Sequence, residues 1–139
     1  MSRTILVFAF ISALLFDGAC ATKSTSPAGK VIKSAKSGDL TINIESASGE
    51  LKRGHNDLIL TFADDSAKPV DVGAASLNFH MPTMGSMAEM NDKATLTTTG
   101  TPGRFNASVE IQVAGTWEAQ VKYQGSHGSG ESSMTVQAK

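Results

Sequence analysis

The sequence has few of the cysteine and histidine residues that form disulfides or structural metal sites. Its 139 residues include one cysteine and three histidines, so an internal disulfide is excluded and a thiolate zinc site lacks ligands. Charge is also sparse and balanced, with 12 Lys and Arg against 13 Asp and Glu, and neither sign forms a long block. A nucleic-acid binder needs a basic stripe, so this composition argues against a nucleic-acid partner.

Catalytic motifs are missing as well. The chain contains no Gly-x-Ser-x-Gly elbow, no phosphate-cradling glycine loop followed by a helix pattern, and no His-Glu-x-x-His helix. Hydrolase, nucleotide-binding and zinc-protease functions therefore have no support, and we expect a protein that is not an enzyme. What is present is a chain with 40% hydrophobic residues, of a length suited to one globular domain.

The N-terminal segment reads as an export signal. Residues 5–16 form an uncharged apolar run (ILVFAFISALLF) behind Arg3. This run has the length of a signal-peptide core and is shorter than the roughly 20 residues that span a bilayer. We expect residues 1–20 to be a signal peptide, residues 21–37, which are rich in Ser, Thr and Lys, to be a flexible linker, and residues 38–139 to be an extracytoplasmic domain.

The single cysteine, Cys20, ends this signal and leaves two processing routes open. Gly18-Ala19-Cys20 resembles the end of a bacterial lipobox, which would lipidate Cys20 and anchor the protein to an inner or outer membrane from the periplasmic side. Asp17 departs from the lipobox pattern. Alternatively, signal peptidase cuts before Thr22 and releases a secreted protein. Contact with a membrane is expected only through this lipid anchor.

From residue 39 onward the apolar residues repeat with a period of two. The alternation is clearest over 105–113 and again over 117–123, and Gly and Pro at 100–103 suit a hairpin connection. Glycines and serines over 125–133 predict a loop. The pattern predicts an all-β domain, an antiparallel β-sandwich of about seven strands, with a small barrel as the alternative. The expected core is built on the large aromatic residues Phe62, Phe79, Phe105 and Trp117.

Methionine is concentrated in one place. Four of the six methionines fall within ten residues, in a stretch where Pro82 is expected to stop a strand. Thioether sulfur is a soft ligand that selects Cu(I), and a neighbouring imidazole binds copper in either oxidation state. The candidate copper ligands are His80, Met81, Met84, Met87 and Met90.

Other functions fit the same residues. The methionines can fill the open end of a sandwich, or form an apolar docking or adhesion surface for a protein partner, because Met adapts to irregular contacts. His80, on the polar side of an alternating strand, can simply be solvated. His55 and His127 are each isolated in sequence and are expected to be solvated loop residues.

Four short motifs together resemble the YtkA-like domain family, which is related to FixH-type proteins. They are Lys68-Pro69-Val70, the run His80–Gly85 (HMPTMG), Gly103-Arg104-Phe105 and Gly115-Thr116-Trp117. The similarity extends over roughly 39–138, and the MPxMG and GxW pieces are fairly specific in combination. Met81 and Met84 match the methionines of the family motif.

The resemblance implies an immunoglobulin-like β-sandwich that is exported or tethered to a membrane. It also implies a link to copper handling or oxidase assembly, with a copper-handling or membrane protein as the partner and no enzymatic activity. Met87 matches the family motif less closely, while His80 and Met90 rest on the residues alone. The chain lacks an evident uncleaved membrane helix with a following cytoplasmic region, which separates it from FixH-type proteins.

Overall fold

The computed structural model describes residues 29–139, which form nine β-strands. The predicted signal peptide, Cys20 and residues 21–28 of the predicted linker lie outside the described residues. The strands are β1 Lys30–Ser37, β2 Leu40–Ser46, β3 Gly54–Ala63, β4 Ala74–Met81, β5 Met90–Lys93, β6 Thr95–Thr98, β7 Arg104–Ile111, β8 Gly115–Gly125 and β9 Gly128–Ala138. Within this part of the chain, no helix is long and apolar enough to cross a membrane.

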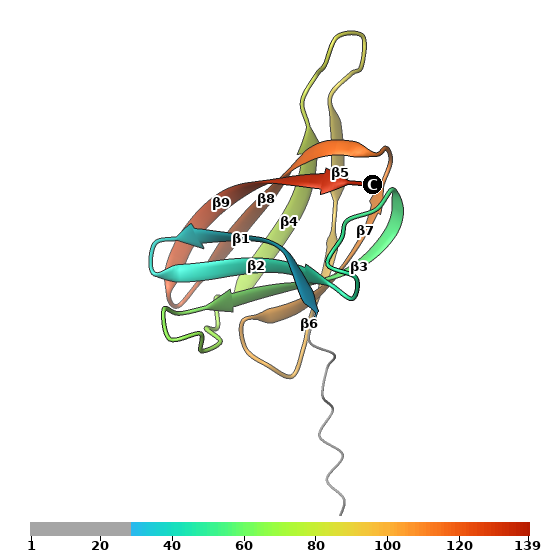
Figure 1. Cartoon of the computed structure of the whole chain (residues 1–139). Helices are drawn as coiled ribbons and strands as arrows, with labels where there is room; N and C mark the ends of the chain where they lie inside the picture. Colours follow the sequence, from blue (N-terminus) through green and yellow to red (C-terminus); the bar gives the residue numbers. More distant parts are fainter. Residues whose placement is uncertain (1–28) are drawn as a thin grey trace, which may run out of the picture.

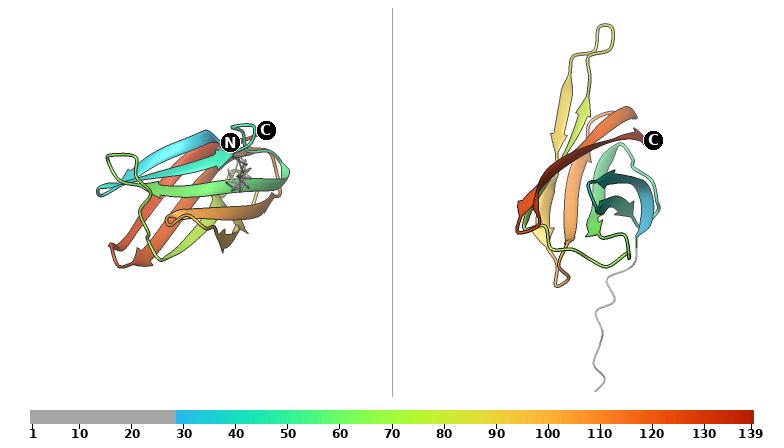
Figure 2. Two further views of the ribbon diagram at one scale, coloured as in Figure 1. Left: turned by 90° about the horizontal axis from the view of Figure 1, so that it is seen from below. Right: turned by 90° about the vertical axis from the view of Figure 1, so that its left-hand side faces the viewer.

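The strands form two antiparallel sheets packed face to face (Figures 1 and 2). One sheet has the order β1-β2-β3-β7-β6 and the other the order β5-β4-β8-β9. The strands β2, β3, β4, β7 and β8 bury every second residue over most of their length, as β7 does with Phe105, Ala107, Val109 and Ile111. The predicted all-β antiparallel sandwich is confirmed, because period-two alternation leaves one apolar face per sheet and two such faces cover each other.

The aromatic residues expected in the core are buried there. Trp117 is 1% exposed, and its indole N–H donates to the carbonyl oxygen of Val113 at 3.1 Å. Phe62 and Phe79 are fully buried, and Phe62 packs edge-to-face on Phe105 with ring centroids 6.0 Å apart. The polar atom of the indole is therefore satisfied while its ring fills the interior.

The strand count is nine rather than about seven, for two reasons. First, residues 90–98, which include the last of the four clustered methionines, form two short strands in different sheets, β5 and β6. The buried Ala94 is the only residue between them, and its N–H donates to the carbonyl oxygen of Leu77 at 2.9 Å. A single residue that carries the chain from one sheet to the other leaves no Gly or Pro signal in the sequence.

Second, the predicted linker 21–37 is wrong over its last eight residues, which form β1. β1 pairs with β2, contains an irregularity between Val31 and Lys33, and packs Ile32 and Ala35 against the core. Charged residues such as lysine protect a strand at the edge of a sheet from aggregation. The lysines of β1 serve that role, and they also gave the segment the composition of a flexible linker. The domain therefore begins before residue 38.

The predicted loop over 125–133 is also wrong. Strand β9 starts at Gly128, with two residues between it and the end of β8 at Gly125, and the two strands pair along their whole length. The first half of β9 buries no side chain, whereas Met134, Val136 and Ala138 do. Small polar residues are tolerated there because neither face of that half-strand packs against the core. The sequence therefore shows no alternation of apolar and polar residues in this part of β9.

Candidate functional site

The methionine stretch forms a β-hairpin that projects beyond the sandwich, as Figure 1 and the right-hand view of Figure 2 show at the top of the molecule. β4 and β5 pair from Asn78↔Lys93 to Met81↔Met90. The same register continues to an isolated bridge between Met84 and Met87. Pro82 has no N–H to donate, and the ladder is interrupted there, but the hairpin continues to its turn.

The tip is a two-residue turn formed by Gly85 and Ser86. Met84 and Met87 bond to each other through their main chains, with N···O distances of 3.2 and 2.9 Å. Gly85 has φ +56°, the positive value that the first central position of a type II′ hairpin turn requires. A Gly-Ser pair between two strands was the available signal for this turn, and the sequence prediction of a strand stop at Pro82 missed it.

The four methionines of the hairpin form two cross-strand pairs on opposite faces. Directly opposed residues share a face and successive pairs alternate, so Met81·Met90 and Met84·Met87, three pairs apart, lie on different faces. Met81 is 2% exposed and Met90 packs against the core. Met84 and Met87 are 52% and 44% exposed. We call Met81 and Met90 the root pair, and Met84 and Met87 the tip pair.

His80 belongs to a polar network on the outer face of the four-stranded sheet. Its Nδ1 lies 3.2 Å from Asn91 Oδ1 and 3.9 Å from Glu89 Oε1. Asn91 in turn donates to Glu89 at 3.0 Å and accepts from Asn78 at 3.1 Å. Because an amide oxygen only accepts, the proton of a neutral His80 lies on Nδ1. The sequence analysis did not identify Glu89 and Asn91, because they become neighbours of His80 only when β4 and β5 pair.

The five predicted copper ligands are therefore not brought to one point. The pair formed by His80 and Asn91 lies four residues from the tip pair, which is about 13 Å along the hairpin. Met81 and Met90 lie on the opposite face, toward the core. Only Met84 and Met87 combine exposure with direct opposition across the turn. Cys20, the predicted lipidation site, lies outside the described residues.

The remaining histidines lie elsewhere. On the five-stranded sheet, His55 Nε2 is 3.2 Å from Asp57 Oδ1 and His55 Nδ1 is 3.7 Å from Glu110 Oε2. His127 lies in the turn between β8 and β9. Across residues 29–139, no group of three or more His, Cys, Asp or Glu side chains is arranged to hold a metal ion. The thioethers are thus the soft donors to consider at the hairpin.

A family model described as YtkA-like matches residues 34–122. That is more than half of the 139 residues. The chain belongs to the YtkA-like family. The resemblance noted in the sequence is confirmed by this match. No curated protein and no solved structure was found to match the chain.

The motifs of this YtkA-like chain meet in pairs in the fold. A side chain on Gly103 would collide with the carbonyl oxygen of Val70, so the GRF and KPV pieces need close contact. A Cβ on Gly115 would lie 3.2 Å from Cε of Met81, so the GxW and MPxMG pieces also meet. The first methionine of the motif is therefore a packing residue, and the second, Met84, is the exposed one.

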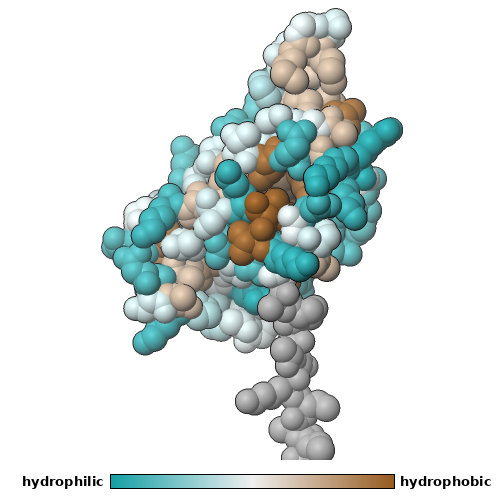
Figure 3. Space-filling view, viewed as in Figure 1, coloured by the Kyte–Doolittle hydropathy of each residue, from teal (hydrophilic) through white to brown (hydrophobic). Residues whose placement is uncertain are grey.

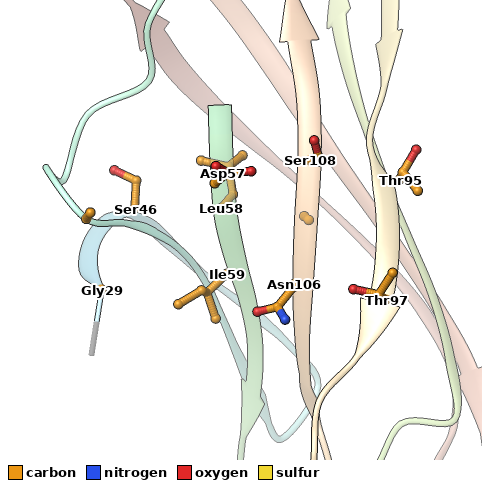
Figure 4. A pocket seen from close by; sticks show the side chains of 11 residues that line it. Gly29, Ser46, Asp57, Leu58, Ile59, Thr95, Thr97, Asn106 and Ser108 are labelled. Carbon is orange, nitrogen blue, oxygen red and sulfur yellow. The ribbon is translucent and has the colours of Figure 1, made fainter. Parts of the chain in front are cut away.

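A separate cavity of about 490 Å³ lies on the outer face of the five-stranded sheet (Figure 4). It extends from Gly29 and Ser46 across β3 and β7 to β6. Ile59 and short side chains form much of its lining, and Asp57 is the only ionisable residue among them. It lacks converging charged groups. The projecting hairpin exposes two methionines, and Figure 3 shows moderately hydrophobic side chains just below its pale end. The hairpin tip is therefore the candidate site.

Proposed function

We propose that this YtkA-like protein is a non-enzymatic extracytoplasmic β-sandwich that carries Cu(I) transiently on Met84 and Met87. The observation behind the proposal is the tip pair itself: two exposed thioethers opposite each other across a two-residue turn. Soft, uncharged sulfur donors select Cu(I) over harder divalent ions. Outside the cytoplasm free thiols are scarce, so methionine is the soft ligand that remains available.

The residues at the tip fit Cu(I), but they supply only two ligands and leave the rest of its coordination sphere open. The tip pair supplies two neutral sulfurs, and no ionisable side chain lies between Pro82 and Ala88. Hard cations gain little from such donors. An open site with few ligands suits delivery of copper to a partner rather than storage, and the projection of the hairpin leaves the tip accessible to that partner.

The location is part of the same proposal. We propose that residues 1–20 export the protein and that Cys20 anchors it by a lipid, which would keep the tip near copper-handling proteins of the cell envelope. The intact mass of the N-terminal peptide tests this point. A mature chain that starts at lipidated Cys20 supports the anchor, and one that starts at unmodified Thr22 contradicts it.

The test of copper binding is competition for Cu(I) with a chromogenic chelator in anaerobic buffer. Changing both tip residues (Met84→Leu, Met87→Leu) keeps apolar volume and removes sulfur. We expect the apparent affinity to fall about tenfold or more, which is at least about 1.4 kcal/mol of binding free energy. The matched control changes the root pair (Met81→Leu, Met90→Leu) and should bind like the wild type. Equal binding by the tip variant would contradict the proposal.

A second function, docking of a protein partner on an apolar tip, has its own support. Met84 and Met87 are half-exposed apolar side chains on a projecting hairpin, and methionine adapts to varied surfaces. The leucine variant separates the two functions because it keeps an apolar surface without sulfur. Retained partner binding in that variant, together with wild-type copper affinity, would favour docking.

A further inference from the structure

The tip offers Cu(I) an incomplete set of ligands. Two thioethers come from one chain, while His80 is about 13 Å away along the hairpin. The root pair lies on the opposite face, with Met81 only 2% exposed. In the part of the chain that the structure describes, the tip projects beyond the sandwich, so no other strand lies beside it to supply donors (Figures 1 and 2). Since residues 29–139 place no further soft donor beside the tip, another molecule is the source of ligands that we consider.

A second copy of the same hairpin brings chemically suitable donors. The stretch from Pro82 to Ala88 carries no ionisable side chain, so two tips can approach without repulsion between like charges. The nearest carboxylate, Glu89, lies toward the root and accepts from Asn91 at 3.0 Å. Because the tip stands clear of the sandwich, two tips can meet while the sandwiches remain apart.

The backbone of the tip does not favour strand-to-strand association. Met84 and Met87 use their N–H and carbonyl groups on each other. Pro82 offers no N–H to a neighbouring strand. Two tips are therefore expected to stay apart in the absence of a metal, because the contact lacks both main-chain hydrogen bonds and a large apolar area.

We propose that Cu(I) joins two copies of this chain tip to tip, with each copy contributing Met84 and Met87. The arrangement rests on the proposed copper-binding function and adds its partner, a second copy of the chain. The same residues from both copies would surround one ion, which is a closed two-fold arrangement that does not propagate into fibres. About four soft donors then replace the two that one tip supplies.

The test measures the molar mass by light scattering after size-exclusion chromatography, in anaerobic buffer, with the protein purified as the producing cell processes it. Without copper we expect a monomer. Half an equivalent of Cu(I) per chain should double the mass, and a chelator should reverse the change. An excess of Cu(I) should restore the monomer, because each tip then holds its own ion.

Two double variants complete the experiment. The tip variant (Met84→Leu, Met87→Leu) should remain monomeric at every copper level, and the root variant (Met81→Leu, Met90→Leu) should dimerise like the wild type. A protein that binds Cu(I) through the tip pair but stays monomeric at half an equivalent of Cu(I) per chain would overturn the dimer and leave the proposed function standing. Absence of Cu(I) binding would overturn both. A dimer that forms without metal, or in the tip variant, would overturn the bridging proposal.

Discussion

The root and the tip of the β4–β5 hairpin carry the same residue type in the same register but differ in surroundings. At the root, Met81 is 2% exposed, and its methyl carbon lies only 3.2 Å from the position that a Cβ on Gly115 would take. At the tip, Met84 is 52% exposed and no second layer covers it. Burial thus decides whether a thioether acts as a packing group or remains available to a ligand.

The root also has polar support that the tip lacks. Asp92, 7% exposed, accepts hydrogen bonds from the main chain of Gln112 at 3.0 Å and from its side-chain amide at 2.5 Å. This contact ties β5 to the connection between β7 and β8. The tip is held by the mutual main-chain bonds of Met84 and Met87. Substitutions should therefore affect the free energy of unfolding strongly near the root and weakly at the tip.

The largest effect is expected in the core that supports the root. Changing Trp117 to Ala removes a side chain that is 1% exposed and leaves a cavity. We expect a loss of about 3–5 kcal/mol in the free energy of unfolding, measured by denaturant titration. An unchanged melting temperature would show that Trp117 does not anchor the core.

The root and the tip can be compared directly with one substitution at each place. Met81→Ala should lower the free energy of unfolding by about 2–5 kcal/mol, since it opens a cavity beside Gly115. Met84→Ala should change it by less than about 0.5 kcal/mol, because its side chain is already half in water. Similar losses in the two variants would mean that the tip is packed as tightly as the root.

A smaller effect is expected from the turn that positions the tip pair. Gly85 has φ +56°, so Gly85→Ala forces an alanine into the left-handed region and should lower the free energy of unfolding by about 1 kcal/mol. Gly100→Ala is the control: a Cβ there meets nothing within 4 Å and φ is not positive. Gly100→Ala should be neutral or slightly stabilising. Equal losses in both variants would contradict the turn assignment.

The smallest effect on the free energy of unfolding is expected from an exposed ion pair outside the hairpin. Glu50 and Lys139 form this pair. The hydrogen bond and charge of Lys139 hold the pKa of the Glu50 carboxyl below its ordinary value. A lowered pKa stabilises the fold above the ordinary pKa, and this contribution is lost as the pH falls through the lowered value. Lys139→Met should raise the pKa of Glu50, as NMR titration would show. No change would mean that the pair does not form in solution.

The parts of the fold that could be predicted from the sequence are the strands with a clear alternation of apolar and polar residues. The alternation over 105–113 indicated β7 because each buried residue, such as Val109, repeats at the interval that a strand imposes. β1 and the first half of β9 were missed because edge strands bury few side chains and carry Lys, Gly or Ser instead. The change of sheet at Ala94 was missed because it depends on contacts with Leu77, seventeen positions earlier.

The candidate site was predictable only in part. The methionine cluster and the family motifs pointed to the correct segment, and the Gly-Ser pair contained the turn signal. The prediction of five ligands at one site depended on treating the segment as a loop. In a hairpin, alternation separates His80 from Met81 and places the root and tip pairs on opposite faces, so composition could not tell which sulfurs share a surface.

The sequence by itself determined that this chain is a strand-rich member of the YtkA-like family with four methionines around Pro82. Those properties are local, since periodicity, turn residues and motifs are set by neighbouring positions. Only the tertiary structure decided that Met81 is buried and that Met84 and Met87 lie opposite each other across the turn with exposed side chains. The physical reason is that burial and cross-strand pairing depend on where the hairpin leaves the sandwich, which contacts between distant strands fix.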